Sequence, residues 1–373
     1  MTIAHRARQV RQRLAGTTKA DVLLISDITN IRWLTGFTGS NGWVVLDPEG
    51  LTLITDGRYG QQAARQMATA GVDGEVLVGA TSPQVVDHIV QCCGRFARVA
   101  FEAAHVTFAQ HVQYTSQFTA MAIVSELVPA TGIVEAERRV KDAGEIEMMA
   151  HACRIADQAL GEVAPTLADG VTEAHVRNHL EIRMRELGAF GPSYETIVAT
   201  GPTNAALPHH RPTSTLIEPG HTVIIDVGAL VDGYHSDMTR TYFIGEPSPL
   251  QRELYDVVLA AQRAGVAAVA PGISTKELDG VCRRIIAEAG YRDWFTHGTG
   301  HGVGLLIHED PFINRAGDTI LQVGDVVTVE PGVYHEGFGG IRIEDLVVVT
   351  SDGCRVLTAS PKDSPCLPSP LTT

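Results

Sequence analysis

The 373-residue sequence has few cysteines and no long apolar run. Its six cysteines are scattered and form no Cys-x-x-Cys pair, which argues against a disulfide framework and against a thiolate zinc site. We therefore expect a reduced, cytoplasmic protein. The longest apolar candidate, Leu254 to Val269, is interrupted by Asp256, Gln262 and Arg263. A membrane span needs about 18 uninterrupted apolar residues, so no membrane association is expected.

Positive charge is also scarce, with 29 Lys and Arg against 43 Asp and Glu and a formal net charge of −14. No basic patch is visible along the sequence to offset this field, so we expect no nucleic-acid partner. The N-terminal arginines, Arg6 to Arg13, lack neighbouring acids. We interpret them as a first helix rather than a transit segment, because the segment is not serine-rich and runs directly into a strand-like stretch.

The composition and the length predict a folded protein with more than one domain. Hydrophobic residues make up 44% and charged residues 19%, which excludes an intrinsically disordered chain. Expected helices cover residues 6–14, 59–70, 83–91, 135–163, 173–187, 249–270 and 276–289, and early strands cover 22–26, 42–47, 51–55, 76–78 and 98–101. We predict a small α/β domain over 1–133 and an α+β domain over 134–373, with a frayed end from Pro361 onward.

Two β-rich blocks, Thr222–Ile244 and Val326–Thr350, each resemble a hairpin carrying two acids. In the first block a turn at Leu230–Gly233 would place Asp226 directly opposite Asp237. Like charges that face each other across a strand pair are destabilising unless a cation lies between them. Asp226 also follows an apolar run that is expected to be buried, and a buried carboxylate needs a partner or a metal.

The second block also places two acids opposite each other across a strand pair. A loop at His335–Gly339 would pair Tyr334 with Gly340 and set Glu330 opposite Glu344. Taken singly, each acid is more often an ordinary turn or surface residue. Two hairpins with opposed acid pairs favour a site over that interpretation.

Three histidines, His297, His301 and His308, fall within twelve residues of a glycine-rich segment. The glycines at alternate positions exclude a stable helix and allow the backbone to approach a ligand or another strand closely. The segment matches neither the dinucleotide fingerprint, since Val303 stands where a glycine is needed, nor His-Glu-x-x-His, since Phe312 stands at the second histidine.

Four carboxylates and one imidazole form an oxygen-rich donor set. This set favours Mn²⁺, Mg²⁺ or related ions, and the histidine also accommodates Co²⁺, Fe²⁺ or Zn²⁺. Four acids carry too much charge for one ion, so we expect two ions about 3–4 Å apart. Such a pair would activate a water and polarise a carbonyl, and the remaining histidines would stabilise an oxyanion or protonate a leaving nitrogen. Amide hydrolysis is the resulting hypothesis.

At these residues the sequence resembles the pita-bread metallopeptidases. The resemblance extends over about residues 135–357, and the order of the five ligand types also matches, in the segments Asp226…Asp237, Gly300-His301-Gly302, Val329-Glu330-Pro331 and Ile343-Glu344-Asp345. Three further segments are similar to the proline-specific branch, aminopeptidase P and prolidase: Ser236-Asp237-Met-Thr239-Arg240-Thr241, Ala206-Leu-Pro208-His209 and His297-x-x-Gly300-His301. Residues 30–37 and 55–59 resemble the creatinase-type N-terminal domain of these enzymes.

The resemblance implies a pita-bread catalytic domain after a creatinase-type α/β domain, a homodimer, and two divalent ions, foremost Mn²⁺, with Co²⁺ or Zn²⁺ as alternatives. The implied ligands are Asp226, Asp237, His301, Glu330 and Glu344, with Asp237 and Glu344 bridging. Glu330 would also shuttle a proton. His209 and His308 would hold the scissile carbonyl, His297 would help form the proline pocket, and Arg342 would orient a carboxylate, its alternative being a surface cross-strand ion pair.

The implied substrates are proline-containing peptides. An Xaa-Pro bond has no N–H, so a dedicated enzyme must recognise the ring and protonate a tertiary amide nitrogen. Phe312 stands where some prolidases carry an arginine for the dipeptide carboxylate, which favours an Xaa-Pro aminopeptidase over a strict Xaa-Pro dipeptidase. Two further alternatives are a non-catalytic pita-bread peptide-binding protein, which would typically have lost metal ligands, and an initiator-methionine aminopeptidase. Creatine hydrolysis is disfavoured because the ligands are intact.

Overall fold

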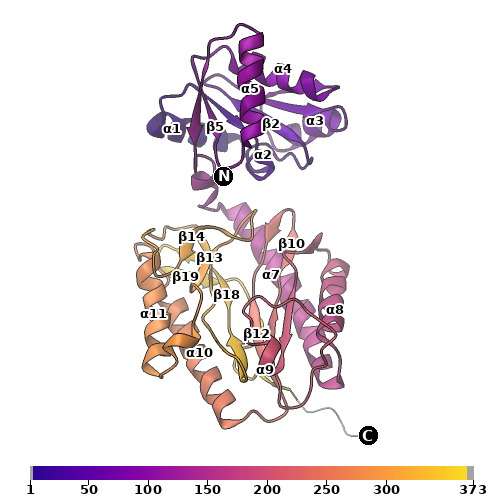
Figure 1. The fold of residues 1–373 in the computed structure, drawn as a ribbon, viewed down its shortest axis with the longest axis vertical. Coiled ribbons are helices and arrows are strands. Elements are labelled where there is room, and N and C mark those ends of the chain that lie inside the picture. The colour runs from indigo at the N-terminus through magenta and orange to yellow at the C-terminus, as the bar shows by residue number, and fades with distance from the viewer. Residues whose placement is uncertain (1–2, 368–373) are drawn as a thin grey trace. The chain divides into compact units, whose positions relative to one another are not determined.

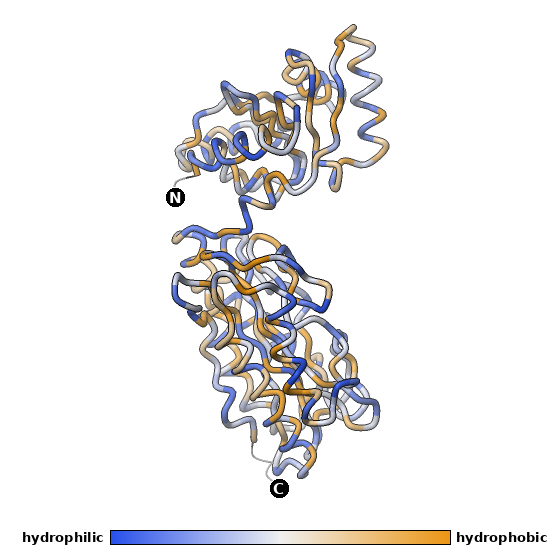
Figure 2. The backbone as a smooth tube through the Cα atoms, turned by 90° about the vertical axis from the view of Figure 1, so that its left-hand side faces the viewer, coloured by the Kyte–Doolittle hydropathy of each residue, from blue (hydrophilic) through white to orange (hydrophobic). Residues whose placement is uncertain are grey.

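A computed structural model describes residues 3–367 of the protein. The chain divides into two compact units, Met1–Arg138 and Arg139–Thr373, which are described separately (Figure 1). Hydrophobic and hydrophilic residues alternate along the tube in Figure 2. Among the described residues, no helix has the length and apolar character that crossing a membrane requires.

The first unit is a six-stranded mixed sheet with helices packed on it. The strand order is β4-β3-β2-β1-β5-β6, and β1, β5 and β6 run parallel. Its strands are β1 Val22–Ile25, β2 Gly42–Leu46, β3 Leu51–Asp56, β4 Glu75–Gly79, β5 Arg98–Glu102 and β6 Glu126–Ala130. Its helices are α1 Arg6–Thr17, α2 Ile28–Thr35, α3 Gly60–Thr69, α4 Ser82–Cys93, α5 Phe108–Ala120 and the short α6 Glu135–Arg138. All four residues of β1 are buried, as expected for a central strand covered on both faces.

The sequence interpretation missed α2, α5 and β6 in this unit. Both helices begin with a cap that the sequence contains: Asp27 accepts a hydrogen bond from the Thr29 N–H, and Thr107 forms a capping box with Gln110. Apolar periodicity did not reveal α5, because this helix buries only Tyr114 and Phe118.

The second unit contains two helix pairs that pack on largely antiparallel sheets (Figure 1). The main helices are α7 Ala143–Val163, α8 Glu173–Glu186, α10 Pro249–Ala268 and α11 Thr275–Glu288, with the short α9 at Gly201–Asn204. The first group of strands is β7 Gly191–Pro192, β8 Ile197–Thr200, β9 Thr222–Asp226, β10 Ala229–Val231, β11 Tyr234–His235 and β12 Thr239–Ile244. The second group is β13 Gly300–Gly302, β14 Glu309–Ile313, β15 Val326–Val329, β16 Gly332–His335, β17 Gly339–Arg342, β18 Asp345–Thr350, β19 Gly353–Val356 and β20 Cys366–Leu367.

Two predictions for this part of the chain are wrong: one continuous helix over 135–163 and a frayed end from Pro361. The helix expected over 135–163 is interrupted, because Asp142 caps α7 in a capping box with Glu145 and Lys141 forms a buried ion pair with Glu309. The expected frayed end is ordered up to Leu367: β20 pairs in parallel with β12, and the Phe243 N–H donates to the Pro365 carbonyl at 2.9 Å. Residues 368–373 lie outside the described residues.

Candidate metal centre

The first acid pair lies at the end of the β9–β12 hairpin, in a register two residues away from the predicted one. Asp226 pairs with Thr239 rather than with Asp237. The reason is a two-residue turn at Asp232 and Gly233, whose φ values are 46° and 77°, in place of the expected four-residue turn. A two-residue shift keeps every side chain on the same face of the sheet, so both carboxylates still point to one side.

The Tyr194 hydroxyl joins these two acids. It contacts Asp237 Oδ1 at 2.5 Å and Asp226 Oδ1 through a short hydrogen bond. One hydroxyl proton cannot satisfy two carboxylates, and burial together with the charges of Asp226 and Asp237 raises the pKa of Tyr194 well above its ordinary value. Tyr194 lies outside both predicted hairpins, and no spacing in the sequence marked it as part of the site.

The second acid pair, Glu330 and Glu344, lies between two strand pairs, β15–β18 and β16–β17. Both strand pairs have the same register. Val329 pairs with Asp345 on one side of the two acids, and Gly332 pairs with Arg342 on the other. The predicted register is therefore confirmed, and it sets Glu330 across from Glu344. Glu344 is buried, and its Oε2 accepts a hydrogen bond from Thr239 Oγ1 at 2.7 Å.

His301 brings the two acid pairs together from β13. Its Nε2 lies 3.5 Å from Asp237 Oδ2 and 3.5 Å from Glu330 Oε1. Its Nδ1 lies 3.1 Å from the Gly302 carbonyl, a contact that favours the tautomer with a proton on Nδ1 and leaves Nε2 as a ligand atom. Asp237, His301 and Glu344 each offer a ligand atom within 4.8 Å of the others.

The glycines beside His301 allow this close approach. A Cβ atom at Gly300 would lie 2.0 Å from the Thr328 carbonyl oxygen, and one at Gly302 would lie 2.4 Å from the Asp310 carbonyl oxygen. The alternating glycines are thus required for the neighbouring backbones to lie on either side of β13. This confirms the close backbone approach that the glycine pattern predicts.

The donor set fits a divalent cation. Burial and the neighbouring carboxylates raise the pKa of Asp237 and of Glu344 well above their ordinary values. A positive ion among these oxygens would offset the repulsion and keep both acids ionised. Carboxylate oxygens with one imidazole nitrogen are ligands for Mn²⁺ and related ions.

All nine predicted site residues line one cavity of about 370 Å³. They are His209, Asp226, Asp237, His297, His301, His308, Glu330, Arg342 and Glu344. The rings of His301 and His308 lie 4.4 Å apart, and His297 Nε2 lies 3.0 Å from the Tyr334 hydroxyl. Phe312 also lines the cavity, and its side chain is exposed.

Arg342 is a buried residue that lines this cavity. It donates to Asp226 Oδ2 at 2.6 Å, to the Tyr334 hydroxyl at 2.7 Å and to the Pro208 carbonyl at 3.1 Å. Its Nε donates to Thr239 Oγ1 at 3.0 Å. With 3% of the residue exposed, the alternative of a surface cross-strand ion pair is wrong.

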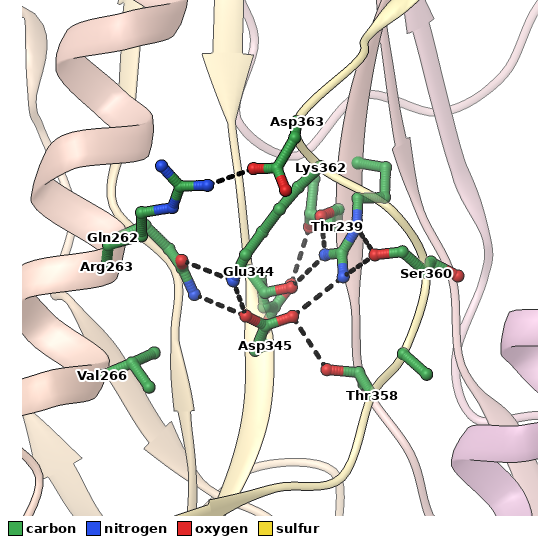
Figure 3. A network of polar contacts seen from close by, with 12 residues as sticks. Thr239, Gln262, Arg263, Val266, Glu344, Asp345, Thr358, Ser360, Lys362 and Asp363 are labelled. Atoms are coloured by element: carbon green, nitrogen blue, oxygen red, sulfur yellow. Dashed lines mark hydrogen bonds and ion pairs between the residues drawn. The ribbon is translucent and has the colours of Figure 1, made fainter.

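A second buried network lies behind Glu344, centred on Asp345 (Figure 3). Asp345 accepts from Arg240 Nη2 and Gln262 Nε2, both at 2.8 Å, from Thr358 Oγ1 at 2.9 Å, and from Lys362. The Arg240 Nη1 also donates to the Glu344 carbonyl. These bonds connect β18, β12, α10 and the C-terminal segment, and thus fix the start of β18, directly after Glu344.

A third network supports the segment of His209. Glu173, which begins α8 and is fully buried, binds His210 Nε2 at 2.9 Å and the N–H groups of Thr200 and Thr213 at 2.8 and 2.9 Å. Burial raises the pKa of Glu173, but the hydrogen bonds from His210, Thr213, Asn204 and Thr200 outweigh this and hold it below its ordinary value.

Comparisons with known proteins agree with this architecture. Residues 147–351 match the model of metallopeptidase family M24, and residues 6–140 match the creatinase/prolidase N-terminal domain. An Xaa-Pro dipeptidase of Pyrococcus furiosus is 42% identical over 64% of this chain and 69% of its own length. The structure of an Xaa-Pro dipeptidase from Bacillus anthracis has a TM-score of 0.92 and 37% identity, covering 98% of this chain and 100% of that one.

An X-Pro aminopeptidase from Thermotoga maritima also has the same fold, with a TM-score of 0.86 and 33% identity over 97% of this chain and 99% of that one. The predicted fold, a creatinase-type α/β domain followed by a pita-bread domain, is confirmed. A family model that covers more than half of the chain, together with a cavity lined by four acids and a histidine in the expected order, identifies the protein as a member of metallopeptidase family M24.

Proposed function

We propose that the protein hydrolyses the peptide bond preceding proline in Xaa-Pro dipeptides, with two divalent metal ions. The observation that carries the proposal is the convergence of Asp237, His301 and Glu344 in a cavity that Glu330 and Asp226 also line. The dipeptide specificity is supported by the relatives named Xaa-Pro dipeptidase.

Asp226, Asp237, His301, Glu330 and Glu344 are proposed to be the residues that would hold the ions. The 3.5 Å separations of His301 Nε2 from Asp237 and from Glu330 support a shared cluster. When bound there, divalent ions would lower the pKa of a water and polarise the scissile carbonyl.

The remaining residues of the cavity orient the substrate and move the proton. The proline nitrogen carries no hydrogen in the peptide bond, so it must receive a proton as it leaves. Glu330 is proposed to take a proton from the attacking water and deliver it to that nitrogen. His209 and His308 are proposed to donate to the carbonyl oxygen as charge develops there, and His297 to border the proline ring.

The choice between dipeptidase and aminopeptidase depends on the substrate carboxylate. The sequence argument favoured an aminopeptidase because of Phe312, whereas the names of the relatives give more support to a dipeptidase. Arg342 already uses four of its five N–H groups on Thr239, Pro208, Tyr334 and Asp226, which leaves one for a substrate. Xaa-Pro aminopeptidase is therefore the second candidate function.

Product analysis with Mn²⁺-loaded protein tests both candidates. Incubation with Ala-Pro and with Ala-Pro-Ala, followed by mass spectrometry, should show release of alanine and proline from the dipeptide and little cleavage of the tripeptide. Preferential cleavage of Ala-Pro-Ala to Ala and Pro-Ala would support the aminopeptidase. No cleavage of either peptide with Mn²⁺, Co²⁺ or Zn²⁺ would reject both. Cleavage of Met-Ala-Ser instead would indicate an initiator-methionine aminopeptidase.

Manganese as the bound metal, the homodimer and the cytoplasmic location stay predictions. Reloading chelator-treated protein with one metal at a time tests the first, and light scattering of the purified protein tests the second.

A further inference from the structure

A groove in the second unit, away from the metal ligands, gathers four arginines. It has a volume of about 550 Å³ and is lined by Arg283 and Arg284 of α11, Arg292 of the 3₁₀ turn Arg292–Trp294, and Arg315 of the loop after β14. Its acidic lining residues are Glu288 and Asp293. The chain carries a net charge of −14, so this local excess of cations is unusual for the molecule. The sequence showed no basic patch because the arginines come from three separate segments.

Three of these arginines are available to a ligand. Arg284, Arg292 and Arg315 are exposed, and none forms an ion pair with another described residue. Gly280, which also lines the groove, is exposed, and a Cβ atom there would meet nothing within 4 Å. These three arginines outnumber the two acids of the groove, Glu288 and Asp293, so its lining keeps an excess of positive charge that an anion would offset.

The fourth arginine, Arg283, contacts the segment that leads to the candidate metal centre. Arg283 Nε binds Asp279 Oδ2 at 2.5 Å, and its other nitrogens donate to the carbonyls of Phe295 and His297. Asp279 in turn accepts from the Thr299 N–H at 3.1 Å. The segment 297–299 leads directly into His301, so Arg283 connects one wall of the groove to the strand of the metal centre.

We propose that this groove binds a small anion with two or more phosphate groups. A guanidinium group presents a planar fork of donors that matches the oxygens of a phosphate. A single carboxylate would neutralise only one of the arginines, whereas a diphosphate carries several charges in a compact volume and reaches several forks at once. The groove volume lies within the range of small-molecule sites, about 300–1,000 Å³.

Calorimetric titration of the Mn²⁺-loaded protein with pyrophosphate tests the proposal. One pyrophosphate should bind per chain, and the double variant Arg284→Gln/Arg315→Gln should bind at least about tenfold more weakly, since each lost charged hydrogen bond weakens binding by more than a kcal/mol. Raised salt should weaken binding in the wild type more than in the variant. Arg355→Gln, an exposed arginine on β19, is the matched control and should bind as the wild type does.

The double variant also controls for removal of Mn²⁺ by pyrophosphate, because its metal ligands are unchanged. Equal affinity in the double variant and the wild type would overturn the proposal, as would a tighter affinity for a glutamate-rich peptide, which would indicate an acidic protein partner instead. The titration contains no peptide substrate, so its outcome does not depend on the proposed dipeptidase activity.

Discussion

Arg342 and Asp226 form a buried ion pair, with Arg342 Nη2 2.6 Å from Asp226 Oδ2. The two residues end different hairpins, since Arg342 closes β17 and Asp226 closes β9. The other oxygen of the Asp226 carboxylate accepts from the Tyr194 hydroxyl. Asp226 is therefore oriented by protein groups on both of its carboxylate oxygens.

Replacement of Arg342 by lysine should weaken metal binding. Lysine cannot reproduce the planar fork that contacts Asp226 and Tyr334 together. Loss of a residue that orients a metal ligand typically lowers metal affinity about 10–100-fold, and calorimetric titration with Mn²⁺ measures the change. Arg355→Lys is the control, and an unchanged Mn²⁺ affinity in Arg342→Lys would contradict the prediction.

Removal of a proposed metal ligand should abolish stabilisation of the fold by metal. Mn²⁺ at about 100 times its Kd should raise the free energy of unfolding of the wild type by about 2.7 kcal/mol. Asp237→Asn should lose this increase and the peptidase activity together, because the buried amide carries no charge to hold the ion. Thermal unfolding with and without Mn²⁺ measures the stabilisation by metal in each variant. Asp318→Asn, at an exposed position, should behave as the wild type.

Substitution of Asp345 should destabilise the fold strongly. Asp345→Asn removes the charge that pairs with buried Arg240 and with Lys362, and breaking a buried pair typically costs about 3–5 kcal/mol. Asp363→Asn removes an exposed partner of Arg263 in the same region (Figure 3) and should cost about 0–1 kcal/mol. Urea unfolding compares the two variants, and similar losses in both would show that the network contributes little.

Glu173 should make stability depend on pH at the acid end. Its pKa in the folded state lies below the ordinary value of 4.5, so its stabilisation is present above that value and is lost as the pH falls through the folded pKa. Glu173→Gln should lower the free energy of unfolding at pH 7 by about 1–3 kcal/mol. The difference from the wild type should shrink as the pH falls below 4.5, as measured by urea unfolding; a constant difference would refute the prediction.

Phe312→Arg should shift the specificity toward dipeptides. The new guanidinium group would lie at the cavity and bind the carboxylate of the substrate, and one charged hydrogen bond is worth about 1.5–3 kcal/mol, or about tenfold or more in kcat/KM. The ratio of kcat/KM for Ala-Pro to that for Ala-Pro-Ala measures the shift. Phe312→Gln is the control, because it also removes the aromatic ring but adds no charge. An equal change of the kcat/KM ratio in Phe312→Gln would show that the charge is not the cause.

Much of the candidate site could be predicted from the sequence because its four acids belong to two hairpin-like segments. The register of the second hairpin follows from its loop, and Glu330 and Glu344 lie where that register sets them. In the first hairpin the tight turn at Asp232 and Gly233 was not recognised, but the period of two along a strand kept both acids on one face. Tyr194 could not be predicted, because it reaches the acids from a separate segment.

The sequence by itself determined the types of the candidate ligands, their order and the hairpin segments in which the acids lie, since residue type, local spacing and strand periodicity are local properties of the chain. Only the tertiary structure decided which groups meet. It placed Arg342 on Asp226, gathered Arg240, Gln262 and Lys362 around Asp345, and formed one groove from arginines of three segments. These contacts join residues far apart in the chain, and the packing of whole helices and sheets, rather than any local pattern, fixes their distances.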